Sequence, residues 1–200
     1  MAGRENHRQR LIEGALKCLR EKGYAHTTAR DIAAASNANL GSIGYHFGSK
    51  DALLREALSE GLRQWTQYFL TRALAHEGAG PLEHLRTFWS GAAESVQEQQ
   101  GLMLAFIEAL PAAARSPVLR AQLADLTEET RRASQATIEA AIPGAEAFDE
   151  RTARTLASLL IAVIDGLALQ WLIDPKRAPT GEELAAALDS IVLTATRLLS

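Results

Sequence analysis

The most informative segment of the chain, residues 27–54, reads TTARDIAAASNANLGSIGYHFGSKDALL. Thr28 and Asp31 have the spacing of a capping box, which opens a helix over about 28–35. Asn37 tolerates the left-handed backbone of a tight turn, and Asn39 can cap another helix over about 40–46. The segment therefore predicts two short helices joined by a tight turn, followed by the start of a longer helix.

Helical periodicity continues along the rest of the chain, and no alternating strand pattern persists. Gly23 is expected to end the first helix, Ser49 to cap the fourth, and Gly101 to separate the fifth from the sixth. Pro111 is expected to shorten or kink the sixth. The fold class predicted is all-α with nine helices, over about 6–22, 28–35, 40–46, 50–76, 82–98, 102–113, 117–141, 147–173 and 182–199.

The third helix has one apolar side and one compact polar side. Ile43 and Phe47, with Ile32 and Ala33 of the second helix, can pack onto the first helix, whereas Leu40 either packs inward or faces out. The outer side offers Asn39, Gly41, Ser42, Tyr45 and His46. A protruding helix of this kind suits the major groove of DNA, in a three-helix helix-turn-helix head.

The charge is unevenly distributed. The whole chain has a net charge of −3, but residues 1–50 carry eight basic and four acidic residues, a net of +4. A basic head on an acidic body is expected when only one end meets a polyanion. We therefore expect a DNA-binding domain over residues 1–50 and a second domain over residues 51–200.

Residues 8–54 resemble the DNA-binding domain of the TetR family of transcriptional regulators. The resemblance rests on Thr-x-Arg-Asp-Ile-Ala at 28–33 and Tyr-His-Phe-Gly-Ser-Lys-Asp-Ala-Leu-Leu at 45–54. It implies a cytoplasmic, nucleoid-associated homodimer that binds a pseudo-palindromic operator in double-stranded DNA. It also implies a small-molecule effector pocket in the body, and repression that the effector relieves.

The resemblance assigns DNA contacts to individual residues. Thr28 matches a phosphate contact and Arg30 a base or phosphate contact, while the contact positions of the third helix and its flank fall on Ser42, Tyr45, His46 and Lys50. Asn39 and Gly41 complete the candidate set. For Tyr45 and His46 local packing is the alternative, for Arg30 a surface ion pair, and for Lys50 simple solvation.

Three positions depart from the pattern of the family. Asn37 stands where the family often has Gly, which the left-handed tolerance of Asn accommodates. Leu40 stands where the family often has Lys, so a phosphate contact is missing or a thymine methyl is contacted instead. Gly44 stands where the family often has Tyr, so the role of that tyrosine is not transferred.

The body carries large apolar side chains on several helices. By resemblance, an effector cavity is expected to involve Trp65, Phe69, Phe88, Trp89, Met103, Phe106, Asp165 and Trp171. The alternative for each aromatic residue is an ordinary place in the core. Asp165 lies within an apolar run and must be paired if it is buried, either structurally or with an effector. Weaker polar candidates of the same kind are Gln170, Glu108, Glu94 and His84, and buried carboxylates facing the cavity would favour a cationic or hydrogen-bond-donating ligand.

The last two helices are expected to form the dimer interface. Helix 147–173 is apolar nearly all round, and helix 182–199 has a wide apolar stripe. The run 156–173 approaches the length of a membrane span, but Asp165, Gln170 and flanking charges favour a buried helix in a soluble protein without a membrane partner.

Other classes of function fit the sequence less well. The five histidines lack the spacing of metal ligands, no Gly-rich phosphate loop occurs, and Cys18, the only cysteine, falls on the apolar side of the first helix. We therefore expect no enzyme activity, metal site or cofactor. The remaining alternative is a DNA-binding architectural or interaction protein without a small-molecule effector.

Overall fold

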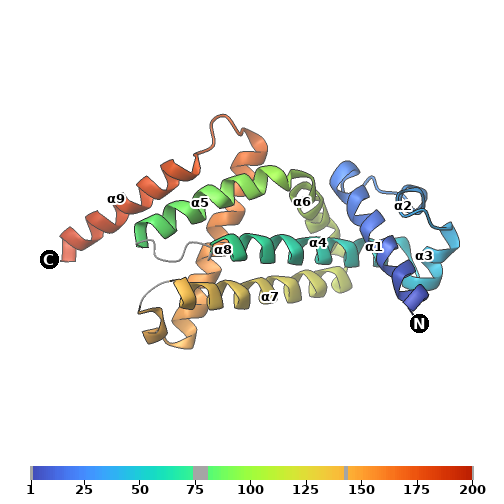
Figure 1. Ribbon diagram of the computed structural model, residues 1–200, viewed down its shortest axis with the longest axis horizontal. Coiled ribbons are helices and arrows are strands. Elements are labelled where there is room, and N and C mark those ends of the chain that lie inside the picture. The colour runs from blue at the N-terminus through green and yellow to red at the C-terminus, as the bar shows by residue number, and fades with distance from the viewer. Residues whose placement is uncertain (1, 74–80, 142–143, 200) are drawn as a thin grey trace. The chain divides into compact units, whose positions relative to one another are not determined.

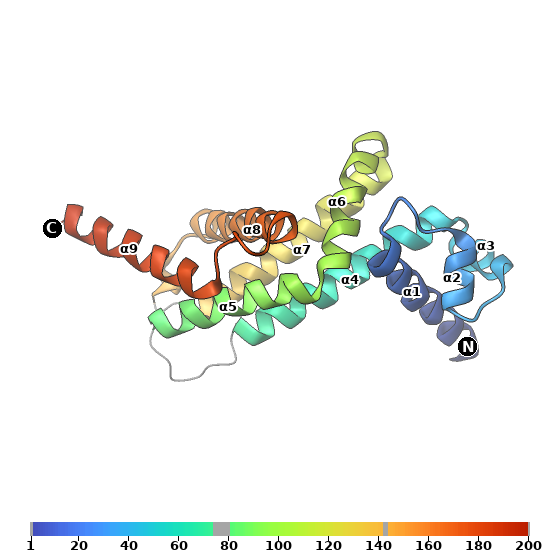
Figure 2. The same ribbon diagram turned by 90° about the horizontal axis from the view of Figure 1, so that it is seen from above.

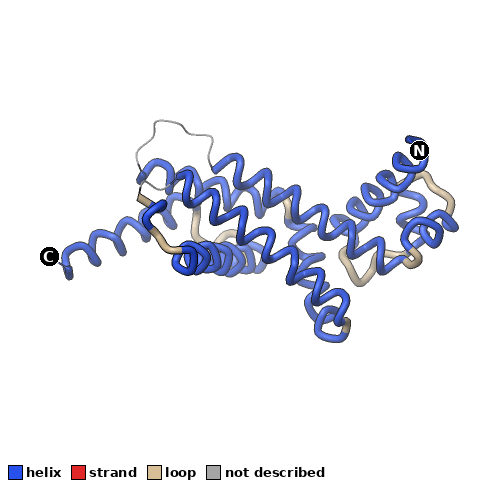
Figure 3. The backbone as a smooth tube through the Cα atoms, turned by 90° about the horizontal axis from the view of Figure 1, so that it is seen from below, coloured by secondary structure: helices blue, strands red, loops and turns tan. Residues whose placement is uncertain are grey.

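The computed structural model describes residues 2–73, 81–141 and 144–199, and the elements in these ranges are helices (Figures 1 and 3). Their order is α1 (Ala2–Lys22), α2 (Ala29–Ala35), α3 (Leu40–Phe47), α4 (Lys50–Ala73), α5 (Pro81–Glu98), α6 (Gln100–Arg115), α7 (Pro117–Ala141), a short 3₁₀ turn (Ala145–Ala147), α8 (Glu150–Ile173) and α9 (Gly181–Leu199). Over the described residues, the predicted nine-helix all-α fold is confirmed.

The chain forms two compact units. The first contains Met1–Trp65 and Gln99–Glu128, and the second contains Thr66–Glu98 and Glu129–Ser200. Helices α4 and α7 contribute residues to both. This division follows packing, and our expectation of functional domains over 1–50 and 51–200 stays a prediction.

The first unit has one continuous apolar core. Leu11 and Leu19 of α1 are fully buried together with Ile32 of α2, Leu54 of α4 and Leu102 of α6. Cys18 is also buried, which raises the pKa of its thiol through lost hydration. The three-helix head of α1, α2 and α3 therefore shares its core with parts of α4, α6 and α7.

In the second unit, α5 packs against α8 and α9 (Figure 2). Trp89 of α5 and Trp171 of α8 are buried, and the indole nitrogen of Trp171 donates a hydrogen bond to the carbonyl of Pro179 at 2.8 Å. That bond fixes the loop between α8 and α9 against the end of α8.

Several predicted helix limits were wrong. Helix α1 begins at Ala2 rather than at about residue 6, and Pro111 does not shorten α6, which continues to Arg115. For two other limits the physical reason is identifiable. Gly101 does not separate α5 from α6 but lies inside α6, where a Cβ would overlap the backbone of Arg20. Because glycine has no side chain, α6 can approach the backbone of α1 closely at this position. Helix α8 begins at Glu150 and not at 147, because Asp149 caps it by accepting a hydrogen bond from the amide of Thr152 at 2.7 Å. Residues 74–76 of the predicted fourth helix lie outside the described residues.

Candidate functional site

The N-terminus of α2 is held by the predicted capping box. The Thr28 hydroxyl accepts a hydrogen bond from the amide of Asp31 at 3.2 Å, and the Asp31 carboxylate accepts one from the amide of Thr28 at 2.9 Å. Lys22 also donates to Asp31 at 2.6 Å. The Lys22 ammonium and the Thr28 donors hold the pKa of the Asp31 carboxyl well below its usual range. This end of α2 is therefore fixed in orientation.

The turn between α2 and α3 has the predicted geometry. Asn37 adopts a left-handed backbone with φ of 46°. The Asn39 side chain caps α3 by accepting a hydrogen bond from the amide of Gly41 at 2.9 Å. The two asparagines thus fix the angle at which α3 leaves the turn.

Helix α3 has one buried side and one exposed side. Ile43 is 3% exposed within the core of the first unit, whereas Tyr45 is 67% exposed and Leu40 is 48% exposed. Leu40 thus takes the outward alternative. Ile43 thus anchors one side of α3 in the core, and the side chains on the other side are exposed.

The glycines of α3 are not required by the packing of the protein itself. A Cβ at Gly44 would meet nothing within 4 Å, and one at Gly41 would meet only the Asn39 side chain, at 3.6 Å. Glycine in a helix costs about 0.5–1 kcal/mol relative to alanine. The packing of the described residues therefore gives no reason for glycine at either position.

The other candidate DNA contacts differ in exposure. Arg30 is exposed on α2, and Ser42 is half-buried on α3. His46 is half-buried, with its ring edge-to-face on Tyr45 at 5.0 Å and stacked on His7 at 6.3 Å. Local packing therefore accounts for part of the position of His46.

Lys50 is already engaged within the protein. Its ammonium donates to the carbonyl of Thr27 at 3.1 Å and lies 3.6 Å from the carboxylate of Asp51. The alternative that Lys50 is merely solvated is therefore wrong for this structure. The contact places the charge of Lys50 beside the residue that precedes the cap of α2.

The candidate effector residues are divided between the two units. In the first unit Met103 is buried, and Trp65 and Phe106 are half-buried against the core that includes α1. The second unit holds Phe69, Phe88, Trp89, Asp165 and Trp171. Phe69 contacts Phe88, and Phe88 contacts Trp89, with ring centroids 4.9 and 5.1 Å apart.

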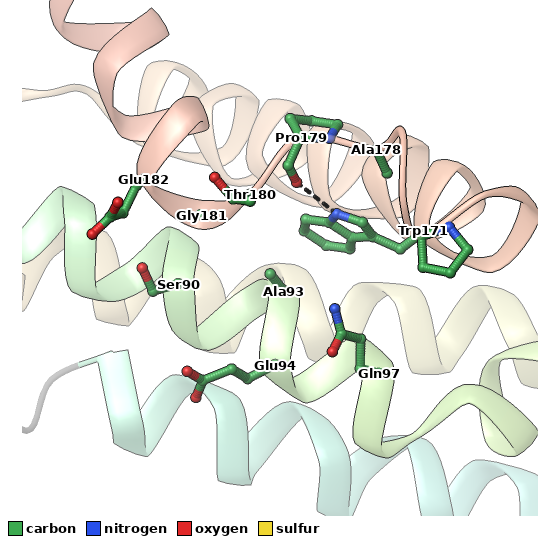
Figure 4. A pocket seen from close by; sticks show the side chains of 11 residues that line it. Ser90, Ala93, Glu94, Gln97, Trp171, Ala178, Pro179, Thr180, Gly181 and Glu182 are labelled. Atoms are coloured by element: carbon green, nitrogen blue, oxygen red, sulfur yellow. Dashed lines mark hydrogen bonds between the residues drawn. The ribbon is translucent and has the colours of Figure 1, made fainter.

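A pocket of about 360 Å³ lies in the second unit, between α5 and the segment that joins α8 to α9 (Figure 4). Of the eight main effector candidates, Trp171 lines this pocket, and so does Glu94, one of the weaker polar candidates. Glu182 supplies a second carboxylate. Among the described residues that line it, none is a lysine, arginine or histidine. The structure thus places a hollow near one of the eight main candidates, while the other seven lie elsewhere.

Asp165 does not have the fully buried position expected from its apolar surroundings. It is exposed in the single chain, although nearby protein atoms remove part of its hydration and raise the pKa of its carboxyl. Gln170 is exposed on the same helix, and the side chain of His84 is not among those described. Asp165 thus faces outward from the unit.

Much apolar surface on α8 and α9 is exposed. Leu159 is 60% exposed, Ile173 82%, Ile191 63% and Leu198 82%. Among the described residues, α8 is the one helix that is long and apolar enough to cross a membrane, judged by length and composition alone. In its most apolar 18-residue stretch, 28% of the residues are buried inside the chain. A helix that packs in a soluble protein passes the same test.

One contact was not predicted. Glu108 of α6 accepts a hydrogen bond from the backbone amide of Ala25, 83 residues earlier, at 3.1 Å. The sequence marks Glu108 only as a weaker polar candidate of the same kind as Asp165, without indicating its partner. Nothing in the local pattern points to a loop so far away in the chain.

Comparisons with known proteins agree with this geometry. The family described as "Bacterial regulatory proteins, tetR family" matches residues 11–57, and the one described as "BetI-type transcriptional repressor, C-terminal" matches residues 81–196. The HTH-type transcriptional regulator BetI of Burkholderia mallei (strain NCTC 10229) is 28% identical over 189 residues, covering 94% of this chain and 93% of the relative.

Two solved structures extend the comparison. A putative transcriptional regulator from Pseudomonas aeruginosa PAO1 has the same fold, with a TM-score of 0.69, 24% identity, and coverage of 96% of this chain and 93% of that chain. The multidrug binding protein EbrR, complexed with imidazole, has a TM-score of 0.63 and 28% identity, with coverage of 90% of this chain and 91% of that chain.

Members of the TetR family bind DNA and small-molecule ligands and act as dimers, and they are soluble cytoplasmic regulators rather than enzymes. The exposed helix α3, its capped turn and both family matches lead to one conclusion. The chain belongs to the TetR family, with a BetI-type C-terminal region, and is a ligand-responsive DNA-binding transcriptional regulator.

Proposed function

We propose that this chain is a homodimeric repressor that binds a pseudo-palindromic operator and leaves it when a small-molecule effector binds. The observation that carries the proposal is the contrast between the two sides of α3. Ile43 anchors the helix in the core, whereas Tyr45 is 67% exposed on the other side. Two such helices on a two-fold axis would enter successive major grooves on one face of a duplex, about 34–36 Å apart.

The proposed contacts fall into two groups. Asn39, Gly41, Ser42, Tyr45 and His46 present the outer side and end of α3 to base edges and nearby phosphates, with Gly41 allowing the backbone to come close. Thr28 at the N-terminus of α2 and Lys50 at the start of α4 contact phosphates, and Arg30 contacts a base or a phosphate. Residues 1–50 would form the DNA-binding domain, and association with the nucleoid would follow from operator binding.

The dimer would form through α8 and α9. The exposed side chains Leu159, Val163 and Leu169 lie along α8, and Ile191 and Leu198 lie along α9. Large exposed apolar patches on soluble proteins mark interaction sites, and exposed apolar side chains recur along both helices. A second copy of the chain, packed with its own α8 and α9, would cover both helices in a four-helix interface and bury Asp165 further.

The effector would bind within residues 51–200. The relative EbrR, a multidrug binding protein solved with imidazole, supports a small-molecule ligand for this chain. In the second unit, the predicted residues Phe69, Phe88, Trp89 and Trp171 supply aromatic surface, and Trp171 lines the pocket beside α5. Binding would favour a conformer with a different spacing of the α3 helices, and operator and effector affinities would be reciprocally linked by about 1–3 kcal/mol.

Selection of DNA from a random-sequence pool tests the DNA-binding part directly. The proposal expects an enriched sequence with two-fold symmetry and a complex that contains two chains. Thermal melting with a panel of hydrophobic and cationic molecules then identifies effector candidates, which must lower operator affinity. An enriched site without symmetry, bound by one chain, would contradict the proposal.

A further inference from the structure

Glu108 connects α6 to the turn between α1 and α2. Its carboxylate oxygen Oε2 accepts a hydrogen bond from the amide of Ala25 at 3.1 Å, and the side chain is half-buried. Both residues belong to the first unit. A hydrogen bond from a backbone amide to a carboxylate is stronger than one between neutral groups. This contact therefore constrains the position of the turn.

The turn leaves a space that the carboxylate fills. Gly23 has φ of 80°, and a Cβ there would lie 2.5 Å from Oε2 and 2.7 Å from Oε1 of Glu108. A side chain at position 23 would thus be strained in its backbone and would collide with Glu108. Gly101, about two turns before Glu108 on the same face of α6, has its own close approach to the backbone of Arg20. The end of α1 therefore packs against α6 with little room to shift.

The same turn leads directly to two proposed phosphate contacts. The Thr27 hydroxyl donates to the carbonyl of Gly23 at 2.7 Å, and the Lys50 ammonium donates to the carbonyl of Thr27 at 3.1 Å. Thr27 is 1% exposed, and the next residue, Thr28, caps α2. Hydrogen bonds thus join Glu108 to Ala25, Thr27 to Gly23, and Lys50 to Thr27, and the backbone of residues 23–28 connects them.

We propose that Glu108 is a positioning residue for operator binding: through the turn at residues 23–27 it fixes Thr28 and Lys50 where they contact DNA phosphates. This inference rests on the proposed function. Helix α6 also carries the candidate effector residues Met103 and Phe106. A shift of α6 on effector binding would be transmitted to phosphate contacts through a carboxylate that is itself not a DNA contact.

The test compares Glu108→Ala, Glu108→Gln and Asp125→Ala with the parent protein, using a duplex that the parent has selected from a random pool. Asp125 is an exposed carboxylate on α7 of the same unit, so its removal matches the change in charge. Loss of a negative charge alone would strengthen binding to DNA. Glu108→Ala is expected to weaken binding at least about fivefold, with a salt dependence shallower by about one unit of slope.

Glu108→Gln keeps an acceptor oxygen and is expected to restore most of the affinity and the slope, while Asp125→Ala binds as the parent does or more tightly. Exchange of the Ala25 amide, followed by NMR, is expected to be faster in Glu108→Ala than in the parent. If Glu108→Ala does not fold, the test uses the DNA affinity of Glu108→Gln and the exchange rate of the Ala25 amide in the parent, measured with and without the duplex. Operator binding is then expected to slow that exchange.

Three results would overturn the inference. Glu108→Ala could bind DNA as tightly as the parent, or it could bind more weakly with an unchanged salt dependence. The exchange rate of the Ala25 amide could also be the same with and without the Glu108 carboxylate and with and without the duplex. In each case Lys50→Ala would still weaken binding if the proposed function is correct. Parent protein that selects no DNA would instead refute the proposed function.

Discussion

Truncation of Tyr45 separates the DNA-contacting role of α3 from its structural role. Tyr45 is 67% exposed, so only about a third of its side chain is covered by the protein. A buried aromatic side chain covers 150–250 Å², so Tyr45→Ala removes roughly 50–80 Å² of contact, worth at most about 1–2 kcal/mol. The unfolded chain already covers part of that area, which makes the expected loss of stability smaller.

Ile43→Ala is the matched comparison on the same helix. Ile43 is 3% exposed and packs in the core of the first unit. Removing its side chain is expected to lower the free energy of unfolding by about 2–5 kcal/mol. We therefore expect Ile43 to contribute mainly to folding and Tyr45 mainly to DNA binding.

The expected effect of Tyr45→Ala on operator binding is a loss of about 1–3 kcal/mol for each half-site. Fluorescence anisotropy with the selected duplex measures the affinity at fixed salt, and urea unfolding measures the stability. The reasoning is refuted if Tyr45→Ala binds as tightly as the parent, or if it unfolds as readily as Ile43→Ala.

Four further changes have defined outcomes. Leu40→Lys adds a cation beside the proposed DNA surface and should steepen the salt dependence of operator binding by about one unit, measured by anisotropy. Val163→Glu places a charge on the exposed face of α8 and should convert the dimer to monomer in light scattering; an intact dimer would argue against that interface. The pKa of Asp165 is raised in the folded protein, so the folded protein becomes more stable as pH falls toward that pKa. Asp165→Asn should therefore raise Tm at neutral pH and make Tm depend less on pH. Asp31 has a lowered pKa, so its contribution is present above about pH 4 and is lost in more acidic solution; Asp31→Asn should remove that acid sensitivity from the melting curve, and an unchanged pH profile would speak against the pairing.

The head could be predicted closely because its structure depends on local chemistry. The capping box of Thr28 and Asp31, the left-handed Asn37 and the cap at Asn39 each involve residues within three positions of one another. Such interactions are encoded by residue type and spacing alone. The orientation of α3, and with it the exposed position of Tyr45, follows from these caps.

The body could not be predicted to the same depth because its contacts are not local. Side-chain type marked Trp65, Phe88 and Trp171 as apolar, but it could not separate core packing from a ligand cavity, and the residues fall into different compact units. Gly101 looked like a helix break, although its role is a close approach to the end of α1. Glu108 gave no sequence signal for its bond to Ala25.

Hydroxyl-radical and methylation footprinting of the selected duplex tests the central claim most directly. The account expects two protected major-groove segments on one face of the DNA, centred about 10 base pairs apart and related by two-fold symmetry, and expects Tyr45→Ala to weaken both equally. Protection of a single segment, or protection that Tyr45→Ala leaves unchanged, would contradict it.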